Sequence, residues 1–522
     1  MRIHADVAVV GSGFAGSLAA LALLKRGRRV VLVERGRHPR FAIGESSTPL
    51  ANLLLEELSD RYDLPRVRAF SKWGSWQRAR PDVACGLKRG FTFFFHQPGA
   101  AFADDDDHQR QLLVAASPHD EIADMHWYRP QFDQALAEEA QTEGAVYLDA
   151  TRLERLRYEG DSTILEGERD GRPVRITARF VIDASGPRGF LHRALRLDEA
   201  PCRWLPATQG LYTHFENVTR WDQLRRTPKP PYPIDDAAVH HVFPGGWIWL
   251  LRFNNGLTSA GAALTDPVAA ALGAADGAAA WSRLLATVPS VADQFRSARA
   301  VLPFVHAPRV AFRSARVSGP SWALLPSAAG VIDPLLSTGF PLTLLGVLRL
   351  VDLLERTSPG RDRDAALLAY ERVTLAELDA TERLVAALYA TMDDPTLFKR
   401  LSLLYFAAAS FSEAARRLGR PELAPGFLLS AHPTFGPELA GCASAAVAAP
   451  RGSARSALEA RIDRAIEPFD TAGLLDRGRR DWYPVVAADL LASAAKLNAT
   501  PEEIRRMLER IGMVTANQEE RV

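Results

Sequence analysis

Three glycines and a glutamate near the start of the chain have the types and spacing to hold a dinucleotide. Gly11, Gly13 and Gly16 match the pattern G-x-G-x-x-G. In that pattern the first glycine permits a tight turn, the second lets a pyrophosphate approach the backbone, and the third lets a helix pack closely on a strand. Glu34 follows at roughly the twenty-residue spacing at which an acid accepts a hydrogen bond from a ribose hydroxyl. The spacing predicts a dinucleotide site, with a simple glycine turn as the alternative.

A second group with chemical potential is Ser337-Thr338-Gly339, which precedes a long apolar helix expected from Leu342. Ser337 and Thr338 are at the expected N-cap position of this helix, and Gly339 has no side chain to cover the backbone amides. Because helix N-termini present unpaired amides, this helix start is expected to bind an anion or a carbonyl oxygen. A plain helix cap is the alternative.

Short apolar runs and one helix must position the glycines. Val7 to Val10 is a β-branched run typical of a buried parallel strand, and a second such strand is expected from Arg29 to Val33. Between them a helix is expected from Ser17 to Lys25, with its first amides aimed at the phosphates. A later strand, Arg175 to Ile182, ends in Asp183-Ala184-Ser185-Gly186 and would bring further amides to the same edge.

The rest of the chain alternates between helical and strand-like patterns. Helices are expected over 50–58, 130–143, 266–299 and from 342. From about residue 362 to the end, almost the whole sequence is expected to be helical. Strands are expected over 91–95, 163–168, 210–215, 239–243, 247–253 and 257–263. Ser46 or Ser47 is expected to cap the helix at 50–58.

Composition excludes several classes of protein. The 522 residues include 63 basic and 62 acidic ones, so the charge balance gives no sign of a nucleic-acid surface. The three cysteines show no C-x-x-C spacing and are expected to be reduced, in a cytoplasmic protein. The apolar stretch from Val7 to Leu24 is interrupted by glycines, and the one from Pro341 to Leu354 carries two charges. Neither is expected to span a membrane. No metal site is expected, because the histidines lack acidic partners at ligand spacing.

Four separated segments together resemble the flavin-dependent halogenases, a branch of the FAD monooxygenase superfamily of glutathione-reductase type. They are the glycine loop, Gly44-Glu45-Ser46, Asp183-Ala184-Ser185-Gly186 and Asp333-Pro334-Leu335-Leu336-Ser337-Thr338-Gly339. The run Arg129-Pro130-Gln131-Phe132-Asp133 is similar to the family's Arg-x-x-Phe-Asp segment. The resemblance covers roughly residues 1 to 355.

The family's lysine lies in a Lys-x-Gly-x-x-Phe context in the members that act on phenols and pyrroles. Lys88 in Lys88-Arg89-Gly90-Phe91-Thr92-Phe93 fits this context, and Lys72 is a poorer second candidate. The resemblance implies that reduced FAD and oxygen oxidise a halide held by Ser337-Thr338-Gly339, and that Lys88 delivers the resulting hypohalous acid to an electron-rich carbon. An ammonium can hydrogen-bond hypohalous acid, and an amine whose pKa is lowered by burial can carry the halogen. Trp247 and Trp249 correspond to tryptophans that keep organic substrate away from the flavin.

Three positions depart from the family pattern. Arg252 replaces the proline after the two tryptophans, which would place a charge at an apolar barrier. Pro326-Ser327 replaces a Gly-Asp pair whose acid contacts the ribityl chain. Leu336 replaces a glutamate that polarises the indole in tryptophan-acting members, so a phenol or pyrrole is expected here and not tryptophan.

The resemblance implies an α/β fold with a glutathione-reductase-type FAD-binding domain. We expect this domain over 1–205 and 300–360, an interleaved β-rich substrate domain over 206–299, and a helical C-terminal region over 361–522. The expected cofactor is FAD, reduced by a separate flavin reductase, with a halide ion and a small-molecule or carrier-bound aromatic substrate. The expected catalytic residues are Lys88, Trp247, Trp249, Ser337, Thr338 and Gly339. The expected cofactor-binding residues are Gly11, Gly13, Phe14, Ala15, Gly16, Glu34, Arg35, Gly44, Glu45, Ser46, Ser47, Arg129, Asp183, Ala184, Ser185, Gly186, Asp333, Pro334 and Gly339.

Simpler interpretations of these residues stay open from the sequence. Lys88 can be a strand-edge lysine that reaches solvent, Trp247 and Trp249 can be ordinary core residues, and Arg129 can be a solvated residue at a helix start. The alternative functions are an FAD monooxygenase or a geranylgeranyl-reductase-like flavoenzyme without halide chemistry. A protein that keeps the fold but has lost flavin is a third, suggested by Pro326-Ser327.

Overall fold

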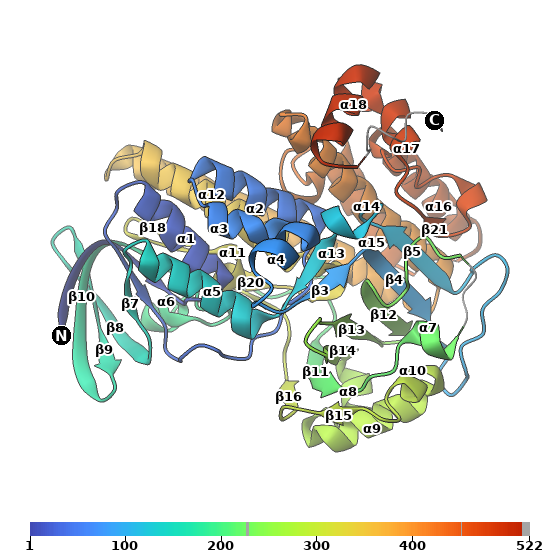
Figure 1. The fold of residues 1–522 in the computed structure, drawn as a ribbon, viewed down its shortest axis with the longest axis horizontal. Helices are drawn as coiled ribbons and strands as arrows, with labels where there is room; N and C mark the ends of the chain where they lie inside the picture. Colours follow the sequence, from blue (N-terminus) through green and yellow to red (C-terminus); the bar gives the residue numbers. More distant parts are fainter. Residues whose placement is uncertain (226–228, 450, 514–522) are drawn as a thin grey trace.

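The computed structural model describes residues 1–225, 229–449 and 451–513. Among these residues a mostly parallel sheet, built from strands within 2–183 and 318–324, lies on the left of the molecule in Figure 1. Its parallel strands lie in the order β19 (Trp322–Leu324), β10 (Arg172–Asp183), β1 (Arg2–Val10), β2 (Val30–Val33) and β7 (Val146–Leu148). β18 (Ser318–Gly319) and the hairpin of β8 (Thr151–Glu159) and β9 (Ser162–Arg169) add antiparallel pairs. The glycine loop therefore leaves the central strand β1, as its pattern predicts.

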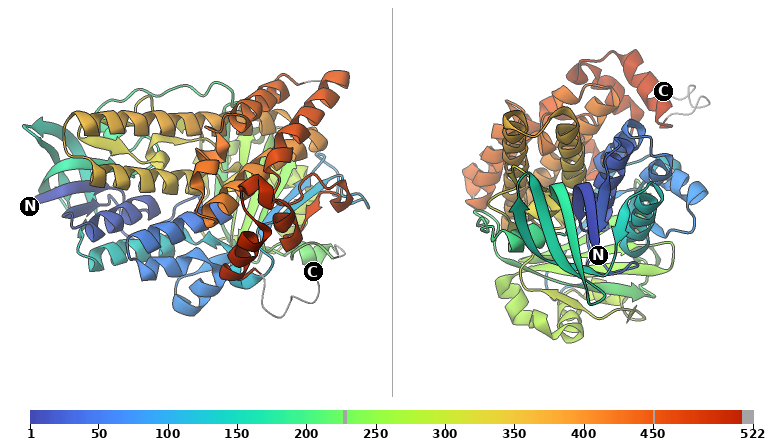
Figure 2. Two further views of the ribbon diagram at one scale, coloured as in Figure 1. Left: turned by 90° about the horizontal axis from the view of Figure 1, so that it is seen from above. Right: turned by 90° about the vertical axis from the view of Figure 1, so that its left-hand side faces the viewer.

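Helices cover the parallel sheet and bury its apolar strands. α1 (Phe14–Lys25) packs between α5 (Arg129–Thr142) and α12 (Gly339–Arg356). The segment Leu335–Arg356 is long and apolar enough to cross a membrane, but 72% of its apolar window is buried inside the protein. Figure 2 shows this helix running along the body of the molecule beside α13 (Arg361–Ala390). The long apolar helix expected from Leu342 is confirmed, and most of its apolar residues are buried.

A second, mixed sheet lies beside the first. Its order is β15 (Arg299–Ala300), β11 (Thr208–Glu216), β14 (Leu257–Thr265), β13 (Gly246–Arg252), β12 (Ala238–Phe243), β4 (Gly90–Phe95), β5 (Gln111–Ala115) and β21 (Trp482–Tyr483), with β16 (Val305–Ala307) also pairing with β11. One face packs on α8 (Asp266–Leu272), α9 (Ala278–Thr287) and α10 (Pro289–Gln294), which lie below the sheet in Figure 1. Aromatic residues on the other face pack on α14 (Pro395–Arg417).

A small sheet connects the two large ones. β3 (Cys85–Lys88) and β6 (Asp124–Trp127) pair antiparallel, with Lys88 directly opposite Asp124. Ser46, in the loop after β2, forms an isolated bridge with His126 of β6. The lysine singled out from the sequence thus ends a strand in the interior of the molecule.

The remaining elements surround this arrangement. They are α2 (Pro49–Arg61), α3 (Pro65–Arg68), α4 (Trp73–Ala79), α6 (Phe190–Ala194), α7 (Trp221–Leu224), α11 (Pro326–Ala329), α15 (Phe435–Val447), α16 (Gly452–Ile466), α17 (Ala487–Ala492), α18 (Pro501–Arg510), β17 (Phe312–Arg313) and β20 (Gly330–Val331). The predicted serine cap of α2 is wrong, because Thr48 is the N-cap and its side chain accepts from the Ala51 amide.

The predicted α/β fold class is confirmed. The domain boundaries stay a prediction, and the second sheet extends beyond the range 206–299: β4 and β5 come from the N-terminal part of the chain and β21 from the C-terminal part. These additions were not visible in the sequence because pairing between distant strands leaves no local signal.

Candidate active site

A first cavity of about 520 Å³ runs from the end of strands β1 and β10 toward the second sheet. Its lining includes these residues of the expected site: Gly13, Phe14, Ala15, Gly44, Glu45, Ser46, Arg129, Ala184, Ser185, Gly186, Trp247, Trp249, Asp333, Pro334, Ser337, Thr338 and Gly339. The expected residues outside its lining are Gly11, Gly16, Glu34, Arg35, Ser47, Lys88 and Asp183. Segments far apart in the sequence are therefore brought together around one space.

The three glycines of the loop differ in how closely other atoms approach them. A Cβ at Gly16 would lie 1.9 Å from the Gly11 carbonyl oxygen, and one at Gly11 would lie 2.6 Å from the Ala184 oxygen. At Gly13 the nearest atoms would be 3.4 Å away, on the guanidinium groups of Arg129 and Arg40. Gly11 and Gly16 thus allow close packing, whereas Gly13 faces the first cavity.

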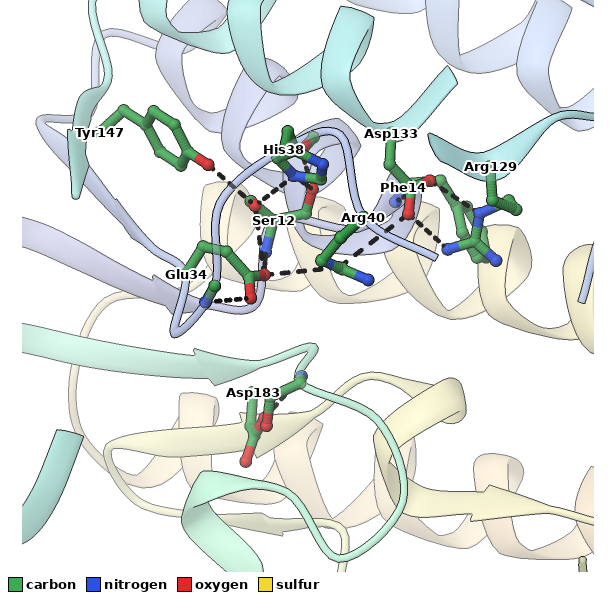
Figure 3. A network of polar contacts seen from close by, with 12 residues as sticks. Ser12, Phe14, Glu34, His38, Arg40, Arg129, Asp133, Tyr147 and Asp183 are labelled. Carbon is green, nitrogen blue, oxygen red and sulfur yellow. Dashed lines mark hydrogen bonds and ion pairs between the residues drawn. The ribbon is translucent and has the colours of Figure 1, made fainter. Parts of the chain in front are cut away.

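Glu34 is held in a polar network at the end of β2 (Figure 3). One oxygen accepts from the Ser12 amide at 3.1 Å and the other from the Gly36 amide at 3.0 Å. Burial opposes the charge of Glu34, but Arg40 and these amides outweigh it and hold its pKa below the usual range. Arg35 is exposed. Arg40, which the sequence argument did not single out, lines the first cavity, and its buried Nε has no partner among the described residues.

Arg129 is buried, so the solvated interpretation is wrong. Two of its nitrogens donate to the Asp133 carboxylate at 2.7 Å (Figure 3), and a third donates to the Gly44 carbonyl at 2.9 Å. Such a bidentate pair fixes orientation as well as charge. Arg129 therefore fastens the Gly44-Glu45-Ser46 turn to helix α5.

Asp183 shapes the second loop at this edge of the sheet. Its fully buried carboxylate accepts from the Ser185 amide at 2.8 Å and from the Leu191 amide at 2.6 Å. The following residues, Ala184 to Gly186, present their backbone to the first cavity.

The start of α12 is an unusual turn. Leu336 and Ser337 both have positive φ, 64° and 55°. Thr338 occupies the N-cap, but its side chain makes no capping bond, so the predicted hydroxyl cap is wrong. The first amides of a helix have no acceptor inside it, and no heavy atom lies within 4 Å of a Cβ built at Gly339. This helix start is open on the first cavity.

Trp247 and Trp249 form a wall of the first cavity, with ring centroids 5.6 Å apart. The Trp247 indole donates to the Tyr389 hydroxyl at 3.2 Å, and that hydroxyl donates to Asp333 at 2.9 Å. The Trp249 indole donates to Ser259 at 3.3 Å. These hydrogen bonds fix the orientation of both indole rings, so Trp247 and Trp249 are not held by apolar packing alone.

Arg252 does not bring a charge into this wall, contrary to expectation. Its guanidinium pairs with Asp235 at 2.8 Å and donates to the carbonyls of Val218 and Thr219 at 2.7 and 2.9 Å. The side chain is turned to the other side of β13, where its charge is neutralised.

Lys88 is fully buried, so the interpretation as a solvent-facing lysine is wrong. Its ammonium donates to the Ser47 carbonyl at 2.5 Å and to the Ser46 hydroxyl at 3.0 Å, and it lies 3.7 Å from the centre of the Phe91 ring. Burial lowers the pKa of Lys88, and the nearby Asp124 carboxylate opposes part of that shift.

A second cavity, of about 170 Å³, lies beside Phe91 and Asp124. Its lining includes Asn52, Phe91, Asp124, Tyr405 and Phe406, whereas Ser46 lines the first cavity. Lys88 itself lines neither cavity, but it contacts Ser46, which lines the first cavity, and Phe91, which lines the second. Lys72, the poorer candidate, also borders the second cavity, but its ammonium lies 3.7 Å from the Glu56 carboxylate.

Asp124 and Tyr389 were missed by reasoning from the sequence. Asp124 is placed by its pairing with Lys88 across two short strands, and Tyr389 comes from a helix far from every motif. Local patterns carry no signal for either.

A family model described as FAD dependent oxidoreductase matches residues 6–334. The protein is thus an FAD-dependent oxidoreductase, an enzyme whose fold and first cavity suit that cofactor. The cavity offers the open amides of the glycine loop, the cationic groups of Arg40 and Arg129, and two buried atoms without partners among the described residues, Arg40 Nε and Glu45 Oε2. Such unsatisfied atoms are expected where a polar ligand completes the site.

Known proteins narrow the class further. The chain is 31% identical over 412 residues to monodechloroaminopyrrolnitrin halogenase PrnC of Pseudomonas fluorescens, covering 77% of this chain and 70% of that enzyme. It is 32% identical over 348 residues to tetracycline 7-halogenase of Kitasatospora aureofaciens, covering 64% of this chain and 60% of that enzyme. The crystal structure of halogenase PltM with phloroglucinol and FAD superposes with a TM-score of 0.81 at 25% identity, over 91% of this chain and 99% of that one. The chain belongs to the flavin-dependent halogenases, which favours that interpretation over the alternative flavoenzymes.

Proposed function

We propose that this enzyme halogenates a small electron-rich aromatic of phenol or pyrrole type, using oxygen, a halide and reduced FAD. The observation that carries the proposal is Lys88, which is buried, hydrogen-bonded to the Ser46-Ser47 turn, and in contact with one lining residue of each cavity, Ser46 and Phe91. One cavity suits the flavin, and the other has room for an organic ring. A lysine at this position can receive an oxidised halogen from one side and present it on the other.

The start of α12 is the proposed halide site. The open amides of Thr338 and Gly339 suit an anion, because the helix dipole adds positive potential there. When bound, FAD in its reduced form supplies the two electrons that, with oxygen and a proton, turn halide into hypohalous acid and water. Trp247 and Trp249, fixed by their hydrogen bonds, keep the aromatic substrate out of the first cavity.

Lys88 is the proposed halogen carrier. An ammonium has three donors, and two of them are used by Ser46 and Ser47. The third is left to hold the oxygen of hypohalous acid. The lowered pKa of Lys88 also gives it a neutral population near pH 7, in which the amine can bear the halogen itself.

The substrate class follows from size and from the relatives. A cavity of about 150 Å³ takes up benzene in another protein, so the second cavity, at about 170 Å³, suits one aromatic ring. Among the relatives, the PltM structure holds phloroglucinol and PrnC is named for monodechloroaminopyrrolnitrin, whereas a third is named for tetracycline. The volume of the second cavity favours a free small aromatic over a carrier-bound or polycyclic one, with a separate flavin reductase as the partner.

The test supplies the enzyme with chemically reduced FAD, oxygen, bromide or chloride, and a panel of phenols, pyrroles and tryptophan. We expect halogenated phenol or pyrrole products and none from tryptophan. Lys88→Ala and Lys88→Met are expected to lose aromatic halogenation by at least 100-fold while hypohalous acid is still formed. Absence of product from every aromatic, or full turnover by both Lys88 variants, would refute the proposal. If Lys72→Ala lost aromatic halogenation while Lys88→Ala kept it, Lys72 and not Lys88 would be the halogen carrier.

A second arm tests the source of electrons. NADPH alone is expected to leave the bound FAD oxidised, while NADPH with a flavin reductase supports turnover. Rapid bleaching of the flavin by NADPH without a partner would instead indicate a single-component monooxygenase.

A further inference from the structure

The second cavity contains a carboxylate oxygen that the protein itself does not satisfy. Asp124 is 5% exposed, and its Oδ1 accepts from the Asn52 side chain at 2.6 Å. Its Oδ2 is buried and has no hydrogen-bond partner among the described residues. Leaving such an acceptor unbonded is costly. A ligand donor in the second cavity would remove that cost.

Asp124 is also placed to act together with Lys88. The two residues are directly opposite in the β3–β6 pair, and such pairs bring side chains on the same face within reach of each other. The recorded hydrogen bonds of Lys88 go to Ser46 and Ser47, so Lys88 does not occupy Oδ2. A ring in the second cavity would therefore meet Asp124 directly, with Lys88 next to the same wall in contact with Phe91.

The other walls define what kind of ring fits. Phe91, Tyr405 and Phe406 are buried aromatic residues of the second cavity, and Phe91 and Phe406 pack edge to face with centroids 5.2 Å apart. These surfaces suit the faces of an aromatic ring. Asp124 offers an acceptor beside them, so a ring with a hydrogen-bond donor is favoured over one without.

We propose that the second cavity binds a single aromatic ring carrying a hydroxyl or ring N–H, and that Asp124 accepts this donor and takes its proton during halogen transfer. This inference rests on the proposed function. It assigns Asp124 as a catalytic base in contact with the substrate, and it makes a free donor group on the ring a requirement.

With a phenol as substrate, halogen transfer is coupled to two proton transfers, one at Asp124 and one at Lys88. The hydroxyl proton passes to Asp124 while a ring carbon uses its electron pair to form the carbon–halogen bond and the halogen–oxygen bond of hypohalous acid breaks. The departing hydroxide takes a proton from the Lys88 ammonium and leaves as water. The halogenated dienone then loses its ring proton to the Lys88 amine and takes back the proton of Asp124 on oxygen. Both side chains return to their starting charge, and the product is the halophenol.

The titratable groups around Lys88 and Asp124 are consistent with these proton transfers. Burial lowers the pKa of Lys88 and raises that of Asp124, and their mutual attraction opposes both shifts, so the two values approach each other. The other titratable or charged groups that face the pair are His126, His240, Tyr405, Glu413 and Arg417. Burial and the Lys88 charge lower the pKa of both histidines, so they stay neutral, and Glu413 pairs with Arg417 at 2.8 Å.

The test compares Asp124→Asn with Asp124→Glu and with Glu57→Gln in the FAD-bound enzyme. Glu57 lies on α2 outside the second cavity and pairs with Arg416, so its substitution is a matched loss of one carboxylate nearby. General-base catalysis contributes about 10²–10⁴-fold, so Asp124→Asn is expected to lose at least 100-fold in bromophenol formation. Its formation of hypohalous acid, measured with a separate trap, is expected to persist. Asp124→Glu is expected to recover part of the rate, and Glu57→Gln to match the wild type.

Two readouts separate this role from a structural one. Phenol should bind the oxidised holoenzyme more tightly than its methyl ether, and Asp124→Asn should remove that preference in calorimetry. The pH profile of the wild type should have an acid limb from Asp124 and an alkaline limb from Lys88. In Asp124→Asn the acid limb should vanish, and the alkaline limb should move to lower pH because the carboxylate that favours the ammonium is gone.

The inference is overturned if Asp124→Asn keeps the wild-type rate, pH limbs and phenol preference. It is also overturned if Asp124→Asn loses hypohalous acid formation in proportion to aromatic product, since the residue would then act on the first cavity. Failure of the proposed function has a different signature: the wild type would form no hypohalous acid, while the binding comparison of phenol with its methyl ether would still report on Asp124.

Discussion

Asp333 is a buried carboxyl group whose protonation is linked to folding. Burial raises its pKa to about 6, although the Leu335 amide and the Tyr389 hydroxyl donate to it at 3.0 and 2.9 Å. An aspartate in the unfolded chain titrates near 3.9. The folded state therefore binds the proton more tightly, and the stability this confers is present below about pH 4 and is lost as pH rises through about 6.

This linkage predicts the behaviour of Asp333→Asn, which cannot ionise. In cofactor-free protein, a shift of about two pKa units corresponds to about 3 kcal/mol at pH 8. The variant should gain stability relative to the wild type as pH rises from 4 to 8, with most of the increase between about pH 4 and 6 and its midpoint near pH 5. Urea unfolding across this range measures the difference. A difference that does not change with pH would show that Asp333 is not the group responsible.

At the level of single residues, the sequence was informative only where a residue stands in a local pattern. Lys88 was found through its neighbours Gly90 and Phe93, and the open helix start through Ser337 to Gly339. Asp124 and Tyr389 were invisible, since their partners are 36 and 56 positions away. Arg252 was misjudged because a sequence does not say to which side of a strand a long side chain turns.

At the scale of elements, two substitutions in the glycine loop test how the loop positions α1 and the cofactor. Gly16→Ala would place a methyl group 1.9 Å from the Gly11 oxygen, which forces the helix away from β1. Overpacking of this kind costs about 1–3 kcal/mol. Gly13→Ala meets nothing closer than 3.4 Å and should change stability by less than about 1 kcal/mol, but its methyl group faces the first cavity and should weaken FAD binding.

Urea unfolding of the cofactor-free variants and fluorescence titration with FAD distinguish the two glycines. Gly16→Ala should lose stability and FAD affinity together, whereas Gly13→Ala should lose mainly affinity. Gly27→Ala is a poor control for this purpose because Gly27 has φ of 71°, which strains any other residue. Equal losses of stability at both loop positions would contradict the assigned roles.

Elements with strong periodicity were predictable, and short paired ones were not. The apolar runs of β1, β2 and α12 are each explained by their own residues, which are almost all buried. β3 and β6 have four residues each and form only with each other. Their pairing is what turns Lys88 inward, so the decisive feature of the site depends on a contact that the sequence does not encode locally.

At the scale of the whole molecule, both ends of the chain build the second cavity. Residues from α2 and β4 form one part of its lining, and residues from α14 and α18 form another. In Figure 2 the C-terminal helices lie against the same part of the body as the second sheet. A C-terminal region that was predicted only to be helical thus helps to set the size of the second cavity.

This arrangement predicts that substrate size is controlled from α14. Phe406 contributes a buried ring to the second cavity, where it packs edge to face against Phe91. Phe406→Ala should enlarge the space by about the volume of that ring and admit a bicyclic aromatic. We expect the ratio of kcat/KM for 1-naphthol over phenol to rise at least tenfold, with hypohalous acid formation unchanged. The control is Phe398→Leu, on the same helix but packed against Phe93 and Phe95 outside the cavity, which should leave the ratio as in the wild type. An unchanged ratio in Phe406→Ala, in protein that binds FAD normally, would mean that the ring is accepted elsewhere and that α14 does not limit its size.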